Sequence, residues 1–209
     1  MIVFAGTIGA GKSTYAGKLA EYLGTKVFYE PVEENPILDK YYQDPKKYAF
    51  SLQIYFLNQR FKNIKAAFFD NNNVLDRSIY EDELFTYLNV LNGNISEEEF
   101  SIYRDLLANM MEELDSLPKK APDLLVFLDS SLDNAVKNIK KRGRVYEQPS
   151  SDNGLYDYYR QLHSHYGQWY ADYDQSPKMR LNVDNYDIHR PEDAQIIFDS
   201  IDTYLEKIQ

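Results

Sequence analysis

The chain has no cysteine, only three histidines, and no apolar run that approaches the ~20 residues of a membrane-spanning helix. The absence of cysteine excludes disulfides and zinc sites with cysteine ligands. The histidines have no spacing typical of metal ligands. A strand is expected to begin at Ile2, which leaves no room for a signal or transit peptide. We therefore expect a soluble, cytoplasmic protein with no membrane partner.

Positive charge is also scarce, because 23 lysines and arginines stand against 33 aspartates and glutamates. The resulting formal net charge of -10 repels phosphate backbones and argues against DNA or RNA as a partner. A small nucleotide is not excluded, since a few local cations suffice to bind it. The length of 209 residues and the apolar fraction of 44% suit one compact domain, expected to span residues 1–209.

Short apolar segments alternate with helical segments along the whole chain. Five strands are expected at residues 2–5, 26–29, 74–75, 123–128 and 179–183. Helices are expected at residues 12–23, 45–70, 81–92, 96–117, 132–141, 157–173 and 191–208. The helix at 96–117 opens with Ser96 and Glu99, a capping box. This alternation predicts an α/β fold with a parallel sheet covered by helices on both faces.

The segment after the first strand has the sequence of a phosphate-binding loop. Residues 6–13 fit the pattern G-x-x-x-x-G-K-[ST], between an apolar strand and an amphipathic helix. Glycines let backbone N–H groups turn toward phosphate oxygens, Lys12 reaches the β and γ phosphates, and the Ser13 hydroxyl ligates magnesium. The following helix directs its positive end at the anion. The expected nucleotide contacts are Gly6, Thr7, Ile8, Gly9, Ala10, Gly11, Lys12, Ser13 and Thr14.

Acidic residues follow the second, third and fourth expected strands, at the edge where open α/β sheets bind ligands. Glu30 can accept the proton of an attacking hydroxyl there. Asp76, beside the phosphate loop, suits magnesium, bound directly or through water. Asp129 follows the strand at 123–128 and is an alternative for the same role. The residues by themselves leave the choice between the two aspartates open.

A wider set of segments accompanies the loop in a fixed order. These are Glu30-Pro31-Val32, Gln53, Asp76-Arg77-Ser78 and residues 142–148, with the sequence RGRVYEQ. Together they resemble the deoxyribonucleoside kinase family over nearly the whole chain, in particular its deoxyadenosine, deoxyguanosine and deoxycytidine kinase branch. The resemblance implies a P-loop kinase with a five-stranded parallel sheet and a lid. It also implies ATP-dependent phosphorylation of a deoxyribonucleoside 5′-hydroxyl, with Mg²⁺ as cofactor.

The resemblance assigns the acceptor residues one by one. Glu30 becomes the general base, Arg77 holds the 5′-oxygen and steadies Glu30, and Asp76 is preferred over Asp129 for the metal together with Ser13. Gln53 binds the nucleobase, for which its amide offers one acceptor and two donors. The other substrate residues implied are Arg60 and Asp82 beside the base, and Tyr42 with Glu147 at the sugar 3′-hydroxyl; Tyr41 is an alternative to Tyr42.

The positive residues of this acidic chain cluster near position 142. The lysines there are explained by the favourable charge at a helix C-terminus, but that reading explains Arg142-Gly143-Arg144 less well. Gly143 gives a flexible joint between two planar cations that can stabilise a transferring phosphoryl group. We therefore interpret residues 142–153 as a lid over ATP, and Lys12, Arg77, Arg142 and Arg144 as stabilisers of the transferred group.

Two other functions compete with this reading. A nucleoside monophosphate kinase needs extra arginines for the acceptor's phosphate, whereas this acceptor pocket contains Glu30. A nucleotide switch of the small GTPase type usually carries Asn-Lys-x-Asp, which the sequence lacks. The resemblance favours deoxyadenosine as substrate, ahead of deoxyguanosine and deoxycytidine. It also implies a homodimer and feedback inhibition by a deoxynucleoside triphosphate.

Overall fold

The computed structural model of the chain describes residues 1–67, 69, 73–115, 121–150 and 154–208. Its five strands form one parallel sheet in the order β2-β3-β1-β4-β5, as the sequence predicts. The central strand β1 pairs Ile2 with Val74 on one side and with Leu124 on the other. The strands are β1 (Ile2–Ala5), β2 (Val27–Phe28), β3 (Val74–Leu75), β4 (Leu124–Asp129) and β5 (Lys178–Asn182).

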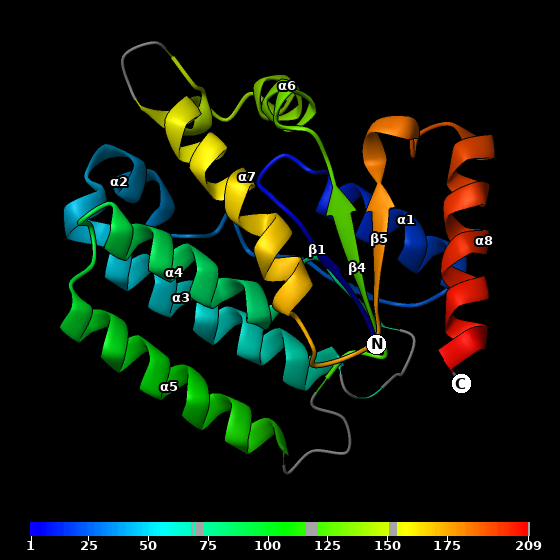
Figure 1. Cartoon of the computed structure of the whole chain (residues 1–209), viewed down its shortest axis with the longest axis horizontal. Coiled ribbons are helices and arrows are strands. Elements are labelled where there is room, and N and C mark those ends of the chain that lie inside the picture. Colours follow the sequence, from blue (N-terminus) through cyan, green and yellow to red (C-terminus); the bar gives the residue numbers. More distant parts are fainter. Residues whose placement is uncertain (68, 70–72, 116–120, 151–153, 209) are drawn as a thin grey trace.

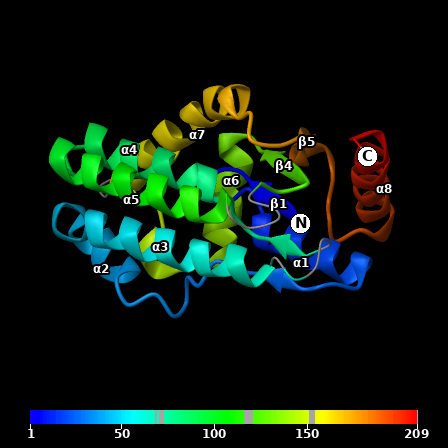
Figure 2. The same cartoon turned by 90° about the horizontal axis from the view of Figure 1, so that it is seen from below.

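Helices cover both faces of this sheet. Those on one side are α3, α4, α5 and α7, and those on the other are α1 and α8 (Figures 1 and 2). The described helices are α1 (Lys12–Leu23), α2 (Leu38–Gln43), α3 (Pro45–Ala67), α4 (Asp82–Leu91), α5 (Glu97–Asp115), α6 (Leu132–Arg142), α7 (Leu155–Asp172) and α8 (Pro191–Ile208). Three short 3-10 helices are η1 (Ile79–Glu81), η2 (Val145–Glu147) and η3 (Val183–Asn185).

The sheet is buried on both sides because successive side chains of a strand point to opposite faces. In β1, Val3 and Ala5 join the core under α3, α4 and α7, whereas Ile2 and Phe4 join the core under α1 and α8. Strands β1, β3 and β4 therefore read as nearly continuous apolar runs, which is typical of parallel sheets, whereas the edge strand β5 alternates polar and apolar residues. All five carboxyl ends meet at the same edge, where the connecting loops are free to form a site.

The expected helices occur with shifted ends, and one helix was not predicted. That helix, α2, has six residues, too few for a periodic apolar pattern to be readable. The helix expected from position 81 begins at Asp82, because Ser78 and Glu81 form a capping box around η1 instead. The capping box predicted at Ser96 and Glu99 is confirmed by reciprocal hydrogen bonds of 2.9 and 3.1 Å. Residues 68, 70 and 116–117 of the expected helices and residues 151–153 of the expected lid lie outside the described part of the chain.

No helix within the described residues is both long enough and apolar enough to cross a membrane.

Candidate active site

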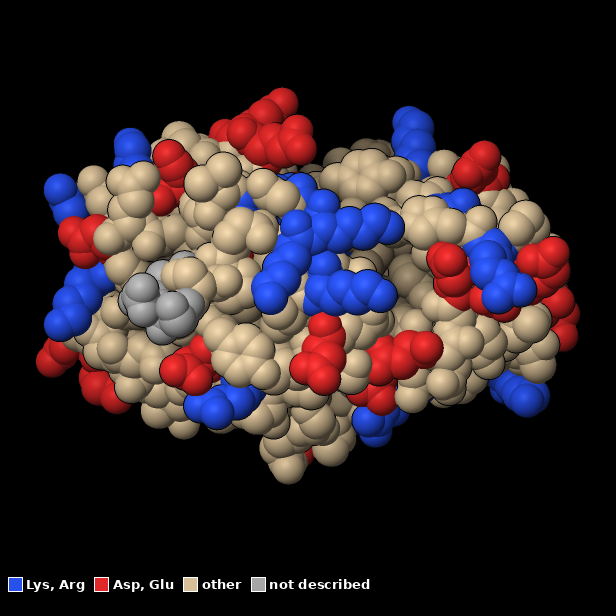
Figure 3. Space-filling view, turned by 90° about the horizontal axis from the view of Figure 1, so that it is seen from above, with Lys and Arg blue, Asp and Glu red and all other residues tan. Residues whose placement is uncertain are grey.

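A cavity of about 1210 Å³ lies at the carboxyl ends of the strands. It extends from the phosphate loop to helix α3 and is bounded by α6 and the turn that follows it. Figure 3 looks down on this edge and shows lysine and arginine side chains gathered at its centre. The cavity brings together acceptor and lid residues named from the sequence: Glu30, Tyr42, Gln53, Arg60, Asp76, Arg77, Asp82, Arg142, Arg144 and Glu147.

The phosphate loop connects the end of β1 to the start of α1. Its glycines are needed because Gly9 and Gly11 have φ angles of +84° and +97°, where a side chain would strain the backbone. A Cβ on Gly9 would also lie 2.2 Å from the carbonyl oxygen of Ala135 in α6. The amide of Asn138, on the same helix, donates to the Gly9 carbonyl at 2.9 Å. Helix α6 therefore fixes the outer wall of the loop.

We expect Gly9→Ala to abolish measurable ATP binding, because both the φ angle and the contact with Ala135 force the loop to move. Equilibrium binding of a fluorescent ATP analogue measures the effect. Gly167→Ala is the matched control, since Gly167 lies inside α7 and an added Cβ there meets nothing within 4 Å. This control should bind normally and gain about 0.5–1 kcal/mol of helix stability. Normal ATP affinity in Gly9→Ala would contradict the role given to the loop.

Lys12 lies under the loop with 7% of its surface exposed. Its ammonium donates to the carbonyl oxygens of Gly6 and Thr7 at 2.7 and 2.8 Å. Burial, followed by repulsion from Arg77, lowers the pKa of Lys12 to about 7 against the partial opposition of nearby carboxylates. With only protein groups around it, this lysine therefore changes charge near neutral pH.

Phosphate binding should therefore be accompanied by proton uptake at Lys12, because an anion favours the charged amine. The sign is fixed by the pKa of about 7: ATP affinity should be highest below pH 7 and should fall as pH rises through that value. Calorimetry of Mg·ATP binding in buffers of different ionisation enthalpy measures the uptake. We expect close to one proton at pH 8 and little at pH 6. Equal uptake at both pH values would contradict the lowered pKa.

Ser13 and Asp76 face each other beside the loop. The Ser13 hydroxyl donates to Asp76 Oδ2 at 2.6 Å. Burial is the main cause that raises the pKa of Asp76, and the Ser13 hydrogen bond and Lys12 oppose the rise. Oδ1 of Asp76 is buried and has no hydrogen-bond partner among the described residues. Asp129, in contrast, forms an ion pair with Arg180 at 2.8 Å on β5. The geometry therefore favours Asp76 over Asp129 as the aspartate near a phosphate-bound cation.

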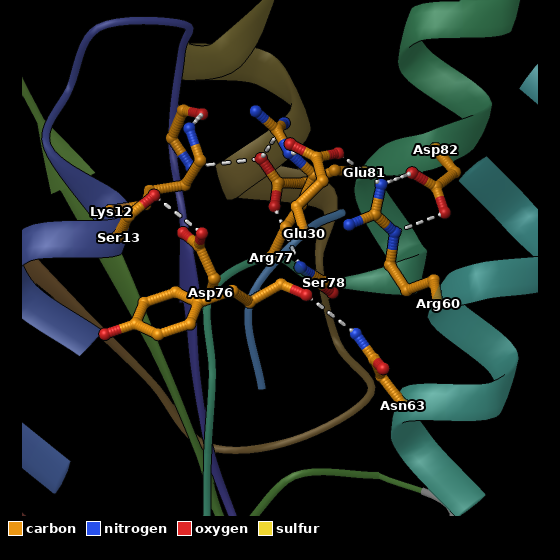
Figure 4. A network of polar contacts seen from close by, with 12 residues as sticks. Lys12, Ser13, Glu30, Arg60, Asn63, Asp76, Arg77, Ser78, Glu81 and Asp82 are labelled. Carbon is orange, nitrogen blue, oxygen red and sulfur yellow. Dashed lines mark hydrogen bonds and ion pairs between the residues drawn. The ribbon is translucent and has the colours of Figure 1, made fainter. Parts of the chain in front are cut away.

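The Glu30 carboxylate lies between two arginines from different segments (Figure 4). Its Oε1 is 3.0 Å from Arg60 Nη2 of α3 and 3.4 Å from Arg77 Nε, which follows β3. Burial by itself would raise the pKa of Glu30, but Arg77, Arg60 and Lys12 together lower it to about 2. Glu30 is therefore ionised at any physiological pH and can accept a hydrogen bond from a hydroxyl in the cavity.

Arg60 and Asp82 form a bidentate ion pair that is buried, with 6% and 2% of their surfaces exposed. Nε and Nη2 of Arg60 each lie 2.6 Å from one oxygen of Asp82. Burial raises the pKa of Asp82 to about 6, a rise that the Arg60 guanidinium limits. Gln53 lies on the same helix as Arg60, and its side chain is 95% buried where it lines the cavity. These three side chains offer both donors and acceptors to a planar ligand.

Glu147 lies in η2, in the turn that follows α6, and lines the cavity. It is 4% exposed and accepts hydrogen bonds from Arg142 Nη2 and Arg144 Nη1. The Tyr42 ring packs against Tyr146, with ring centroids 5.3 Å apart. Burial is the main cause that raises the pKa of Tyr42, and two neighbouring tyrosines and the negative charge of Glu147 raise it further. The Tyr41 hydroxyl instead donates to Asn89 of α4 at 3.1 Å. Both tyrosines line the cavity, and these contacts favour Tyr42 as the partner of Glu147.

The structure adds residues that the sequence did not single out. At the phosphate-loop end the cavity is also lined by residues of α6 and of the connection from β5 to α8: Asn134, Asn138, Tyr186, Asp187, Ile188 and His189. At the other end Tyr158 of α7 joins the wall. Glu81, fully buried, links the loop to Arg77. No short motif marks the positions on α6, α7 and the last loop, because they approach the site only through the packing of those elements. The capping-box pattern of Ser78 and Glu81 does not signal the contact of Glu81 with the loop.

The five-stranded parallel sheet, the phosphate loop between β1 and α1, and a second polar pocket facing that loop define the class of P-loop kinases. The family model of deoxynucleoside kinases matches residues 2–206. The chain therefore belongs to the deoxynucleoside kinase family and is a phosphotransferase with an alcohol group as acceptor.

Individual relatives agree with this assignment. The chain is 54% identical over its full length to a deoxyguanosine kinase of Lactobacillus acidophilus, covering 92% of that protein. It is 47% identical over its full length to a deoxyadenosine kinase of the same organism, covering 97% of it. Among solved structures, deoxyadenosine kinase from M. mycoides with bound dCTP has a TM-score of 0.82 and 31% identity, with 97% of this chain and 100% of that chain covered.

Proposed function

We propose that the enzyme transfers the γ-phosphate of ATP to the 5′-hydroxyl of a purine deoxyribonucleoside. The observation that carries this proposal is the position of Glu30. Its ionised carboxylate faces the same cavity as the phosphate loop, and it is held by Arg60 on the base side and by Arg77 on the phosphate side. A carboxylate at this point suits a neutral alcohol and repels an acceptor that already carries a phosphate.

In the proposed reaction, the phosphate loop at residues 6–14, which includes Lys12, binds the phosphates of ATP. Glu30 orients the 5′-hydroxyl and takes its proton as the oxygen attacks in line. A carboxylate with a pKa of about 2 is a weak base in the ground state, which suits a loose transition state in which the hydroxyl proton leaves late. Arg77, Arg142 and Arg144 then stabilise the charge on the equatorial oxygens, and the lid closes over ATP.

We also propose Mg²⁺ as the cofactor, held by Ser13 and Asp76. One carboxylate and one hydroxyl beside the phosphate loop fit this cation, which usually keeps waters and phosphate oxygens as its remaining ligands. The buried Asp76 Oδ1 has no partner in the described chain, which leaves an acceptor for a metal-bound water. Bound there by Ser13 and Asp76, the cation would neutralise negative charge on the phosphates of ATP during transfer.

The residues proposed to bind the sugar and the base support a purine deoxyribonucleoside as the acceptor. Gln53, Arg60 and Asp82 can pair with the donor and acceptor atoms of a purine edge. Tyr42 and Glu147 are proposed to bind the 3′-hydroxyl, where close packing would exclude a 2′-hydroxyl. The preference for deoxyadenosine stays a prediction from the sequence. One relative with high identity is named a deoxyguanosine kinase and another a deoxyadenosine kinase. We therefore propose both deoxyadenosine and deoxyguanosine as acceptors.

A panel of acceptors with labelled ATP tests this proposal. It contains the four deoxynucleosides, adenosine, dAMP and dGMP. We expect label on the deoxynucleosides alone, with kcat/KM for the better purine at least tenfold above that for either pyrimidine, roughly the discrimination of one to two polar contacts. Labelling of dAMP or dGMP in place of the nucleosides would show a monophosphate kinase. ATP binding with no acceptor-dependent turnover would show a nucleotide switch.

Two further features of the resemblance are proposed for this chain. Tyr87 and Leu91 on α4 and Ile102 on α5 are 40%, 50% and 59% exposed, and such apolar side chains suit a homodimer packed through helices. The cavity runs without interruption from the base residues to the phosphate loop. A deoxynucleoside triphosphate with its base in the acceptor pocket can therefore extend its phosphates toward the loop and act as a feedback inhibitor.

A further inference from the structure

Glu81 has no role in the mechanism above, yet its carboxylate lies at the centre of the polar network (Figure 4). It is fully buried, with 0% of its surface exposed. Its Oε1 accepts hydrogen bonds from the Gly6 N–H at 3.0 Å and from the Tyr166 hydroxyl at 2.7 Å. Oε2 accepts from the Ser78 N–H at 3.1 Å. One side chain thus ties the phosphate loop to helix α7 and to the turn after β3.

The capping box at Ser78 accounts for only one of these contacts. A capping-box glutamate needs to reach the N-cap N–H and nothing more. The second capping box of the chain, Ser96 with Glu99, shows this minimal form at an exposed helix start. Glu81 differs from Glu99 in its complete burial and in its contacts with the loop, α7 and an arginine. A buried carboxylate is costly unless such partners compensate it, so these contacts need a physical explanation beyond helix capping.

The arginine in question is Arg77, which contacts two carboxylates through different nitrogens. Its Nε is 3.4 Å from Glu30, and its Nη1 is 3.3 Å from Glu81. Nη1 also lies 3.3 Å from the Tyr166 hydroxyl. A continuous chain of contacts therefore runs from the acceptor side to the phosphate loop through Glu30, Arg77, Glu81 and Gly6.

We infer that Glu81 is a positioning residue for phosphoryl transfer. It holds the Arg77 guanidinium and the first residue of the phosphate loop in one fixed relation, so that the donor phosphate and the acceptor hydroxyl meet in line. The inference rests on the role proposed for Arg77. The physical reason for an effect on rate is that catalysis of this reaction depends almost entirely on position and charge, and a displacement of about 1 Å can cost a hundredfold.

Glu81→Gln is the informative substitution. It keeps the size of the side chain but replaces one acceptor oxygen by an NH₂ group, which cannot accept from a backbone N–H. Either Gly6 or Ser78 then loses its partner, and Arg77 loses one of its two carboxylates. We expect kcat to fall by about tenfold to a hundredfold, with KM for ATP and for the nucleoside changed by less than about threefold.

Glu99→Gln is the matched control, because it makes the same change in a capping box remote from the cavity. If Glu81 only capped η1, both variants would lower the melting temperature slightly and leave kcat unchanged at a temperature well below melting. That result would overturn the inference. Should Glu81→Gln fail to fold, Tyr166→Phe decides the question, since it removes only the hydroxyl that contacts Glu81 and Arg77. A threefold or greater fall in its kcat supports the inference, and an unchanged kcat overturns it.

A double-mutant cycle separates this inference from the proposal for Arg77. The variants are Glu81→Gln, Arg77→Lys and both together, all measured by kcat. If Glu81 acts through Arg77, the double variant should be within about twofold of Arg77→Lys alone. Multiplying effects would overturn the inference while leaving the role of Arg77 intact. An unchanged kcat in Arg77→Lys would instead defeat the role of Arg77, and the inference with it.

Discussion

Glu30→Gln is expected to lower kcat at least about a hundredfold, the loss typical of removing a general base. Glutamine can still accept a hydrogen bond from the hydroxyl, but it carries no charge and cannot take the proton. Arg60 and Arg77 would also lose the negatively charged carboxylate with which both form ion pairs. The dissociation constant of ATP should change little, because the phosphates are bound by the loop and Lys12. Single-turnover kinetics with labelled ATP, together with direct ATP titration, measures both quantities.

Glu21→Gln serves as the control for this experiment, since Glu21 is an exposed residue of α1. Its turnover should equal that of the unchanged enzyme. A melting curve of Glu30→Gln shows whether the fold is retained, because two buried arginines would then face one carboxylate fewer. Near-normal kcat in a folded Glu30→Gln variant would remove the basis of the proposed mechanism. A large loss of ATP affinity with kcat retained would place Glu30 on the donor side instead.

Replacing both lid arginines by alanine is the second change with a large expected effect. Arginines that stabilise the transferring phosphoryl group contribute about 10³-fold or more to kcat, and Arg142→Ala with Arg144→Ala should cost about that much. Arg142 and Arg144 line the cavity and donate hydrogen bonds to Glu147, which orients both guanidinium groups. Rapid-quench measurement of the transfer step gives the loss.

Two further variants sharpen this test. Lys140→Ala removes a positive charge from an exposed position on α6 outside the cavity lining, and should leave kcat unchanged. Arg142→Lys with Arg144→Lys keeps both charges but loses the planar fork, so an intermediate kcat is expected. If the double alanine variant raised KM for ATP and left kcat unchanged, the arginines would contribute only ground-state binding.

The fold was predictable because its signals are local. The inner strands of the sheet are short apolar runs, and the alternation of strands with helices along the chain predicts the parallel arrangement that the structure has. The prediction missed α2 and placed the start of α4 one residue early. The helix α2 is too short for a periodic pattern to show, whereas the start of α4 is shifted because the capping box of Ser78 and Glu81 opens η1 instead.

The candidate site was predictable to the extent that each residue belongs to a short segment with its own chemistry. Gln53, Arg60 and Glu147 were chosen by resemblance, and the structure brings all three to the cavity that holds Glu30. Their roles stay predictions. Glu81 was missed although it lies between Arg77 and Asp82 in the sequence. Nothing at that position signals its contact with Gly6, which is 75 residues away.

The sequence by itself determined the phosphate loop, because eight consecutive residues contain all the glycines, the lysine and the hydroxyl that such a loop requires. Only the tertiary structure decided the charges around it. Lys12 with a pKa near 7 and Glu30 with a pKa near 2 owe those values to burial and to arginines brought from α3 and from the turn after β3. Ionisation depends on distance and on exclusion of water, and folding sets both of these.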